Sequence, residues 1–150
     1  MIFKLDGDDF LEKTIESLRT FKTLQDLKNA VDTYTENKQR GICIYGDINT
    51  WNVSSVEDMS ELFKNKVNFN EPLDSWDTSN VKNMKGMFEN AKSFNKPLDS
   101  WDISKVESME GMFEGAESML RIYPNLNPTP KKISWEDNFN RAKPTKGAQH

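Results

Sequence analysis

The sequence predicts an α/β fold in the form of a solenoid of three 25-residue coils, with an N-terminal helical cap and an extended C-terminal arm. Trp51, Trp76 and Trp101 stand 25 residues apart, and each opens a copy of one unit, over residues 51–75, 76–100 and 101–125. Each copy combines a helix-like pattern with a stretch typical of a strand. A unit this short cannot bury its apolar face alone, so the copies are expected to stack.

Residues 1–50 are predicted to form a helical cap and a partial repeat. A helix is expected over residues 24–34, with Thr23 as its N-cap and Asp26 as the capping-box partner. Its apolar face carries Leu24, Leu27, Val31 and Tyr34. The segment CIYGDINTW that follows resembles the end of a unit, because Ile44 lies 25 residues before Phe69 and Ile48 lies 25 before Leu73. A strand is therefore expected before the first complete unit.

Each unit is expected to contain one helix and one strand. Val56, Met59 and Phe63 follow the i, i+3, i+7 spacing of a helix face. Pro72 favours an extended chain just before Leu73. A strand and a helix at this period match the plan of a leucine-rich repeat, so the predicted solenoid is leucine-rich-repeat-like. The columns expected in the core are Trp51/Trp76/Trp101, Val56/Val81/Val106, Met59/Met84/Met109, Leu62/Met87/Met112 and Phe63/Phe88/Phe113.

Small polar residues also recur, at Asn70/Asn95 and at Ser54/Ser79/Ser104. One interpretation is a ladder of side chains that binds a ligand. The other is structural: small polar side chains at the corners of stacked coils bond to backbone groups that the turns leave free. The structural interpretation is favoured, because every coil needs its corners satisfied and only some coils carry ligands.

Residues 126–150 are predicted to form a basic extended arm, since they carry three prolines and a net charge of +3. Ser134 is placed to cap a short turn from which Trp135 and Phe139, four residues apart, project on one side. This aromatic hook has two interpretations: it covers the open end of the third coil, or it docks on another molecule. The predicted partner-binding residues are Trp135, Phe139, Lys131, Lys132, Arg141 and Lys143.

The composition argues against catalysis. The only histidine is His150, the last residue, and the only cysteine, Cys43, has no partner for a catalytic dyad. The hydrophobic neighbour Ile44 suggests that the Cys43 thiol is buried. The chain has no glycine-rich phosphate loop and no cluster of Cys and His with zinc spacing. We therefore expect a protein that is not an enzyme and has no cofactor, metal or small-molecule substrate.

Charge and hydropathy bear on partners and location. The net charge is −4, and the body of the chain is acidic, which makes nucleic acid an unlikely partner because phosphate binding relies on clustered Lys and Arg. The N-terminal MIFKLDGDD is interrupted by charges and lacks the apolar core of a signal peptide. No apolar run is long enough to span a membrane. The expected location is the cytoplasm or a virion, and the expected partners are proteins.

The repeat itself resembles a known family. The segments YGDINTWNVSSVEDMSELF and WDTSNVKNMKGMFENAKSFNKPLDSWDISKVESMEGMF are similar to a repeat first noted in mycoplasma lipoproteins of unknown function and grouped with BspA-like leucine-rich-repeat surface proteins. No common activity is attached to that family. Members with a similar leading helix occur in protists and in large DNA viruses, so the resemblance implies a protist or giant-virus member. It implies a structural or protein–protein interaction module, part of an assembly such as a virion, or alternatively a recognition and adhesion module at a cell or host surface.

Overall fold

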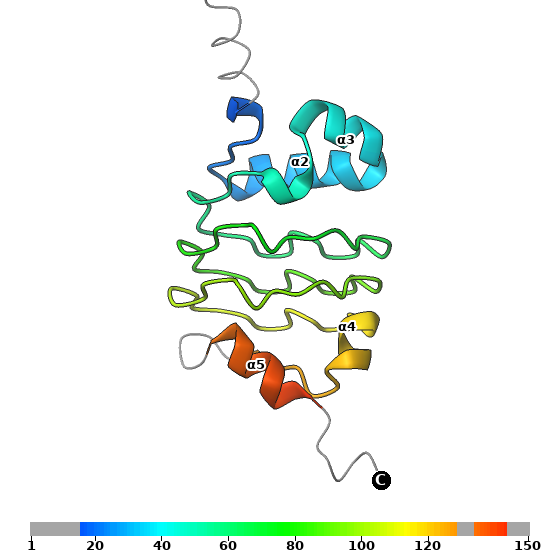
Figure 1. Ribbon diagram of the computed structural model, residues 1–150, viewed down its shortest axis with the longest axis vertical. Coiled ribbons are helices and arrows are strands. Elements are labelled where there is room, and N and C mark those ends of the chain that lie inside the picture. Colours follow the sequence, from blue (N-terminus) through cyan, green and yellow to red (C-terminus); the bar gives the residue numbers. More distant parts are fainter. Residues whose placement is uncertain (1–15, 129–133, 144–150) are drawn as a thin grey trace, which may run out of the picture.

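The computed structural model describes residues 16–128 and 134–143. Its named elements are α2 (Leu24–Glu36), α3 (Lys38–Tyr45), the 3-10 helix η1 (Ile48–Thr50), α4 (Glu117–Ile122) and α5 (Trp135–Ala142). Between η1 and α4, three turn-rich units lie one above another, with α2 and α3 at one end of this stack and α4 and α5 at the other (Figure 1). The helices therefore close a core that the repeats build.

Helix α2 forms where the apolar spacing predicts it and extends two residues beyond the expected end. The hydroxyl of Thr23 accepts a hydrogen bond from the backbone N–H of Asp26 at 3.1 Å, which satisfies one of the free donors at the helix start. Leu27, Ala30, Val31 and Tyr34 make up its buried face. This face covers the apolar end of the first unit.

Helix α3 occupies most of the region where a strand was expected before the first unit, and the expectation of a strand is wrong. Asn37 ends α2 and at once caps α3, because its side chain accepts from the backbone N–H of Arg40 at 3.1 Å. Gly41 lets the two helices meet closely, since a Cβ there would lie 2.6 Å from Cα of Tyr34. Cys43 is exposed on α3, so the expectation of a buried thiol is also wrong.

The three units are joined by a regular backbone ladder. In the first unit, the N–H groups of residues 59, 61, 63 and 65 donate to the carbonyls of residues 83, 85, 87 and 89 at 2.8–2.9 Å. The second unit repeats the pattern: residues 84, 86, 88 and 90 donate to residues 108, 110, 112 and 114 at 2.7–2.9 Å. All these N–H groups point in the same direction along the stack.

The prediction of an α/β leucine-rich-repeat-like solenoid is wrong. Within the described ranges there is no strand, only three isolated β-bridges, and no unit contains a helix over its first half. The φ angles of Glu61 and Asn65 are 57° and 64°, in the left-handed region, where a right-handed helix cannot continue. The helical spacing of the apolar residues arises here from successive tight turns. Nor is the C-terminal arm simply extended, because it contains α5.

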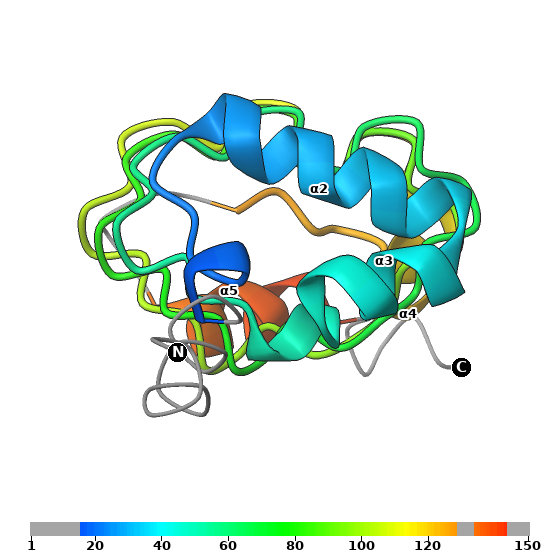
Figure 2. The same ribbon diagram turned by 90° about the horizontal axis from the view of Figure 1, so that it is seen from above.

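The core consists of columns of identical or similar side chains. The Trp51, Trp76 and Trp101 rings stack at centroid distances of 6.4 Å, and each indole N–H donates to a backbone carbonyl at 2.7–3.1 Å. Phe63, Phe88 and Phe113 form a second stack with spacings of 5.3 and 5.5 Å. All five predicted core columns are buried. Viewed along the stack, α2 runs along one edge of the units and α5 lies toward the opposite edge (Figure 2).

Candidate functional site

The two aromatic residues predicted to bind a partner are buried. Trp135 and Phe139 lie on one face of α5 and are 1% and 3% exposed. Ser134 caps this helix as expected, with its hydroxyl accepting from the N–H of Asp137 at 3.1 Å. Of the two interpretations left open by the sequence, the arrangement matches the hook that covers the third unit.

Trp135 ends two aromatic columns at once. Its ring meets Trp101 at 6.4 Å and Phe113 at 6.0 Å, with interplanar angles of 65° and 70°. Phe139 packs on Trp135 at 5.1 Å and on Tyr123 at 4.8 Å. A partner could reach these rings only if α5 left the stack.

The charged residues of the predicted site are placed differently. Arg141 and Lys143 are exposed at the end of α5, whereas Lys131 and Lys132 lie outside the described residues. Partner binding by these four residues therefore stays a prediction. The structure does not bring the two exposed cations together with the aromatic rings on one accessible face.

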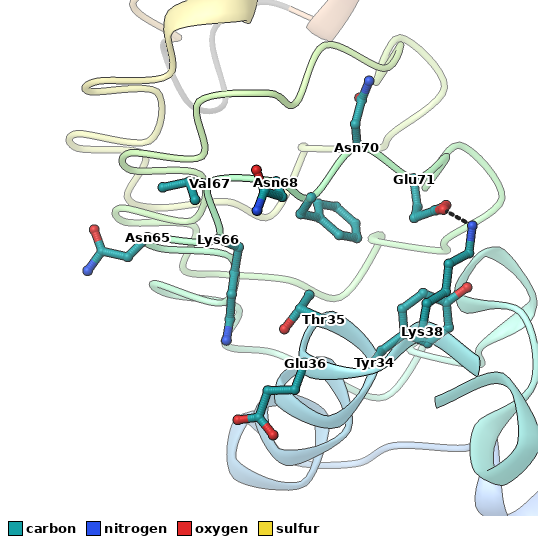
Figure 3. Close-up of a pocket in the computed structure, with 11 residues that line it drawn as sticks. Tyr34, Thr35, Glu36, Lys38, Asn65, Lys66, Val67, Asn68, Asn70 and Glu71 are labelled. Atoms are coloured by element: carbon teal, nitrogen blue, oxygen red, sulfur yellow. Dashed lines mark ion pairs between the residues drawn. The ribbon is translucent and has the colours of Figure 1, made fainter. Parts of the chain in front are cut away.

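A groove that sequence reasoning missed lies between the helical cap and the first unit (Figure 3). We call it the cap groove, lined by residues 34–36, Lys38 and residues 65–71, with a volume of about 380 Å³. Val67 is 42% exposed, and its side chain is a large apolar group among amides and charges. Such a mixture of apolar and polar lining is typical of a contact surface more than of a catalytic pocket.

Two ion pairs join the two sides of the cap groove. Lys38 of α3 contacts Glu71 of the first unit at 2.5 Å (Figure 3), and Lys66 contacts Asp32 of α2 at 2.7 Å. The hydrogen bond and the charge of Glu71 raise the pKa of Lys38, which keeps this amine protonated. Burial raises the pKa of Tyr34, whose hydroxyl accepts a hydrogen bond from the backbone N–H of Ile48 at 3.4 Å. The helical cap and the first unit are thus joined beside the groove by two ion pairs.

The groove could not be found by pattern because its walls come from two different parts of the chain. Its one sequence signal is a run of amides, Asn65, Asn68 and Asn70, in the stretch NKVNFNE. In the second unit, the equivalent stretch NAKSFNK faces the first unit. In the first unit, the same side faces the helical cap. Only the junction with α2 and α3 makes a groove of these residues.

The recurrent polar residues bond within the stack. The side-chain amide of Asn90 donates to Oδ1 of Asn65 at 3.1 Å, and the backbone N–H of Asn95 donates to Oδ1 of Asn70 at 3.1 Å. Ser79 and Ser104 bond to the aspartates two residues earlier through their backbone N–H groups at 3.0 and 2.9 Å. The Asn70 contact agrees with the structural interpretation of the polar columns, whereas the backbone N–H groups of Ser79 and Ser104 are satisfied by aspartates and not by serine side chains.

No group of three or more His, Cys, Asp or Glu side chains within residues 16–128 and 134–143 is arranged to hold a metal ion. None of the helices in those ranges combines the length and apolar character that crossing a membrane requires.

A stack of short repeated units closed by helices at both ends defines a repeat protein. The sequence model of the family described as "Mycoplasma protein of unknown function, DUF285" matches residues 19–148, and the chain belongs to this family. A comparison with curated proteins gave no match. A comparison with solved structures gave none either.

Proposed function

We propose that this chain is a non-enzymatic protein–protein interaction module that binds a segment of a partner protein in the cap groove. The observation that carries the proposal is the groove itself, where the exposed Val67 stands among hydrogen-bonding and charged side chains on a scaffold fixed by the ion pairs of Lys38 and Lys66. An accessible apolar residue with a polar rim is the usual composition of a protein contact. Membership in a family of unknown function is compatible with this role.

The partner is proposed to belong to a larger assembly. A virion is the assembly that the resemblance to members from large DNA viruses favours, and a protist or giant-virus source follows from the same resemblance. Arg141 and Lys143, both exposed at the end of α5, add salt-sensitive attraction to an acidic partner surface. A membrane, a nucleic acid and a small-molecule substrate are not part of the proposal.

The alternative function is recognition at a cell or host surface. It is favoured by the resemblance to BspA-like surface proteins. The two proposals differ in where the native protein is found, so labelling of intact cells or purified virions with an antibody separates them.

The test of the proposed function compares two exposed apolar residues. The native protein is isolated with its associates, and the recovery of each associate is measured for the unaltered chain, for Val67→Asp and for Ile122→Asp. Ile122 on α4 is 46% exposed, close to the value for Val67, and lies outside the groove, so it is the matched control. We expect Val67→Asp to lose the partner and Ile122→Asp to retain it. Equal recovery in all three would contradict binding in the cap groove.

A further inference from the structure

The backbone ladder is unfinished at the C-terminal end of the stack. By the pattern of the first two units, the N–H groups of Met109, Gly111, Phe113 and Gly115 should donate onward to a fourth unit. Within residues 16–128 and 134–143, none of these four groups donates a hydrogen bond. We call these residues the donor edge.

The donor edge is accessible at its two glycines. Gly111 is half-buried, whereas the equivalent Gly86 of the second unit is buried. Gly115 is also half-buried, and the side chains of Met109 and Phe113 lie in the core. A Cβ added at Gly111 would meet nothing closer than a carboxylate oxygen of Glu114 at 3.5 Å. Helix α2 lies beside the ladder segment of the first unit, where Asp32 pairs with Lys66. Because α5 lies toward the edge opposite α2 (Figure 2), it covers the aromatic columns and not this side of the end.

The charges beside the donor edge select its occupant. Free N–H groups in a row attract either an anion or a chain of backbone carbonyls. Glu110 and Glu114 alternate with the donors of this row, are exposed, and form no ion pair in the described part of the chain. Two carboxylates repel an anion and attract lysine or arginine. Between the first two units, a pair of this kind already exists, since Lys64 contacts Glu89 at 3.0 Å.

A second copy of this chain does not fit the edge. It would have to present the matching carbonyls of its own first unit, at residues 58, 60, 62 and 64. Helix α2 lies across that end of the stack (Figure 1), and its apolar face is buried there. The occupant must therefore be a different segment.

We infer that the donor edge binds a basic segment of a partner protein, which lies along residues 109–115 as a fourth rung. The segment supplies backbone carbonyls at alternate residues and two basic side chains four residues apart, facing Glu110 and Glu114. Since the edge only donates, the segment needs no N–H groups on its bound side, and prolines are tolerated there. This inference rests on the proposed function and adds to it the surface and the chemistry of a partner.

The test uses a synthetic peptide as probe. The peptide KNMKGMFKN copies residues 82–90, which accept the ladder of the first unit, with Glu89→Lys so that two lysines face the two glutamates. Amide hydrogen exchange is followed by NMR in the full chain. In the free protein we expect the amides of residues 109, 111, 113 and 115 to exchange at least tenfold faster than those of residues 84, 86, 88 and 90. Saturating peptide should slow the first four at least tenfold.

Charge variants supply the control. Glu110→Lys with Glu114→Lys should weaken peptide binding at least tenfold at low salt, because both ion pairs are reversed. Glu16→Lys with Asp99→Lys changes the net charge equally at exposed sites outside both the donor edge and the cap groove, and should alter binding less than twofold. Failure of the peptide to protect the four amides would overturn the inference. Protection by inorganic phosphate in place of the peptide would overturn it also, by showing an anion site.

The native partner separates this inference from the proposed function. If associates are lost from Glu110→Lys with Glu114→Lys and kept by the control pair, the edge is their binding surface. If they are kept by both, the inference is wrong and the proposed function stands. If the unaltered protein has no associates at all, the proposed function is itself contradicted.

Discussion

The indole of Trp135 meets the face of Trp101 at 65°, whereas Trp76 and Trp101 lie nearly parallel at 4°, although both pairs have centroids 6.4 Å apart. Each tryptophan of the repeat bonds through its ring nitrogen to a backbone carbonyl. Trp135 Nε1 is buried and has no hydrogen-bond partner in the described structure. The last ring of the column thus closes the stack without continuing its pattern.

This difference predicts unequal effects of the same substitution. Trp101→Phe removes the 2.9 Å hydrogen bond to the carbonyl of Leu73, an oxygen that still accepts from the backbone N–H of Trp76 at 3.1 Å. The lost bond should cost roughly 0.5–1.5 kcal/mol beyond the lost ring volume. Trp135→Phe removes an N–H that bonds to nothing. We expect Trp135→Phe to be the milder change in chemical denaturation. A larger loss of unfolding free energy for Trp135→Phe would contradict the assignment.

The central tryptophan should be essential to the core. Trp76 is 3% exposed and stacks on rings above and below. Trp76→Ala leaves a cavity between two rungs and should lower the free energy of unfolding by about 3–5 kcal/mol, measured by urea titration. A substitution of the exposed Ile122 to alanine serves as the comparison and should change it by less than about 1 kcal/mol.

Two glycines at left-handed positions should differ in their tolerance of alanine. Gly111 and Gly115 have φ angles of 66° and 73°. Alanine at either position is strained by about 1–2 kcal/mol. At Gly115 the added Cβ would also collide with Oδ1 of Asn90, while at Gly111 its nearest neighbour is a carboxylate oxygen of Glu114 at 3.5 Å, an ordinary contact. Thermal melts should therefore show Gly115→Ala to be clearly less stable than Gly111→Ala. Equal melting temperatures would show that Asn90 moves aside freely.

Acid should weaken the turns that open the second and third units. Hydrogen bonds from Ser79 lower the pKa of Asp77, and those from Ser104 lower the pKa of Asp102. A carboxylate with a lowered pKa in the folded state stabilises the fold above its unfolded pKa of about 4, and this stability is lost as the pH falls through the folded pKa. The melting temperature should therefore fall between about pH 5 and pH 3.

The first unit provides the control for this pH dependence. It has Asn52 at the equivalent position, where Oδ1 accepts from the N–H and hydroxyl of Ser54 at 3.1 and 2.7 Å. An amide therefore makes the same turn without titrating. Asp77→Asn with Asp102→Asn should keep the fold at neutral pH and flatten the acid dependence. If the double variant shows the same fall in melting temperature at acid pH, other carboxylates cause that fall.

The buried columns were predictable because a 25-residue period requires equivalent positions to face the same neighbours. The helix starts at Thr23 and Ser134 were predictable because capping depends on adjacent residues. The ladder was not, since Val56, Met59 and Phe63 show helical spacing and the turns depend on left-handed φ angles such as that of Glu61. Glutamate carries no signal for that conformation, although the equivalent positions of the other two units hold Gly86 and Gly111, which do. Nor could the cap groove be predicted, because its walls meet only after α2 and α3 pack on the first unit.

The regular stacking of the units fixes the distance between the two ends of the stack. Each unit adds 5.3 to 5.5 Å between successive phenylalanine rings. Insertion or loss of one 25-residue copy would move the cap groove and the donor edge apart or together by one such step, and would leave the residues of each surface unchanged. The copy number of the repeat thus sets the distance between the two proposed binding surfaces in fixed increments.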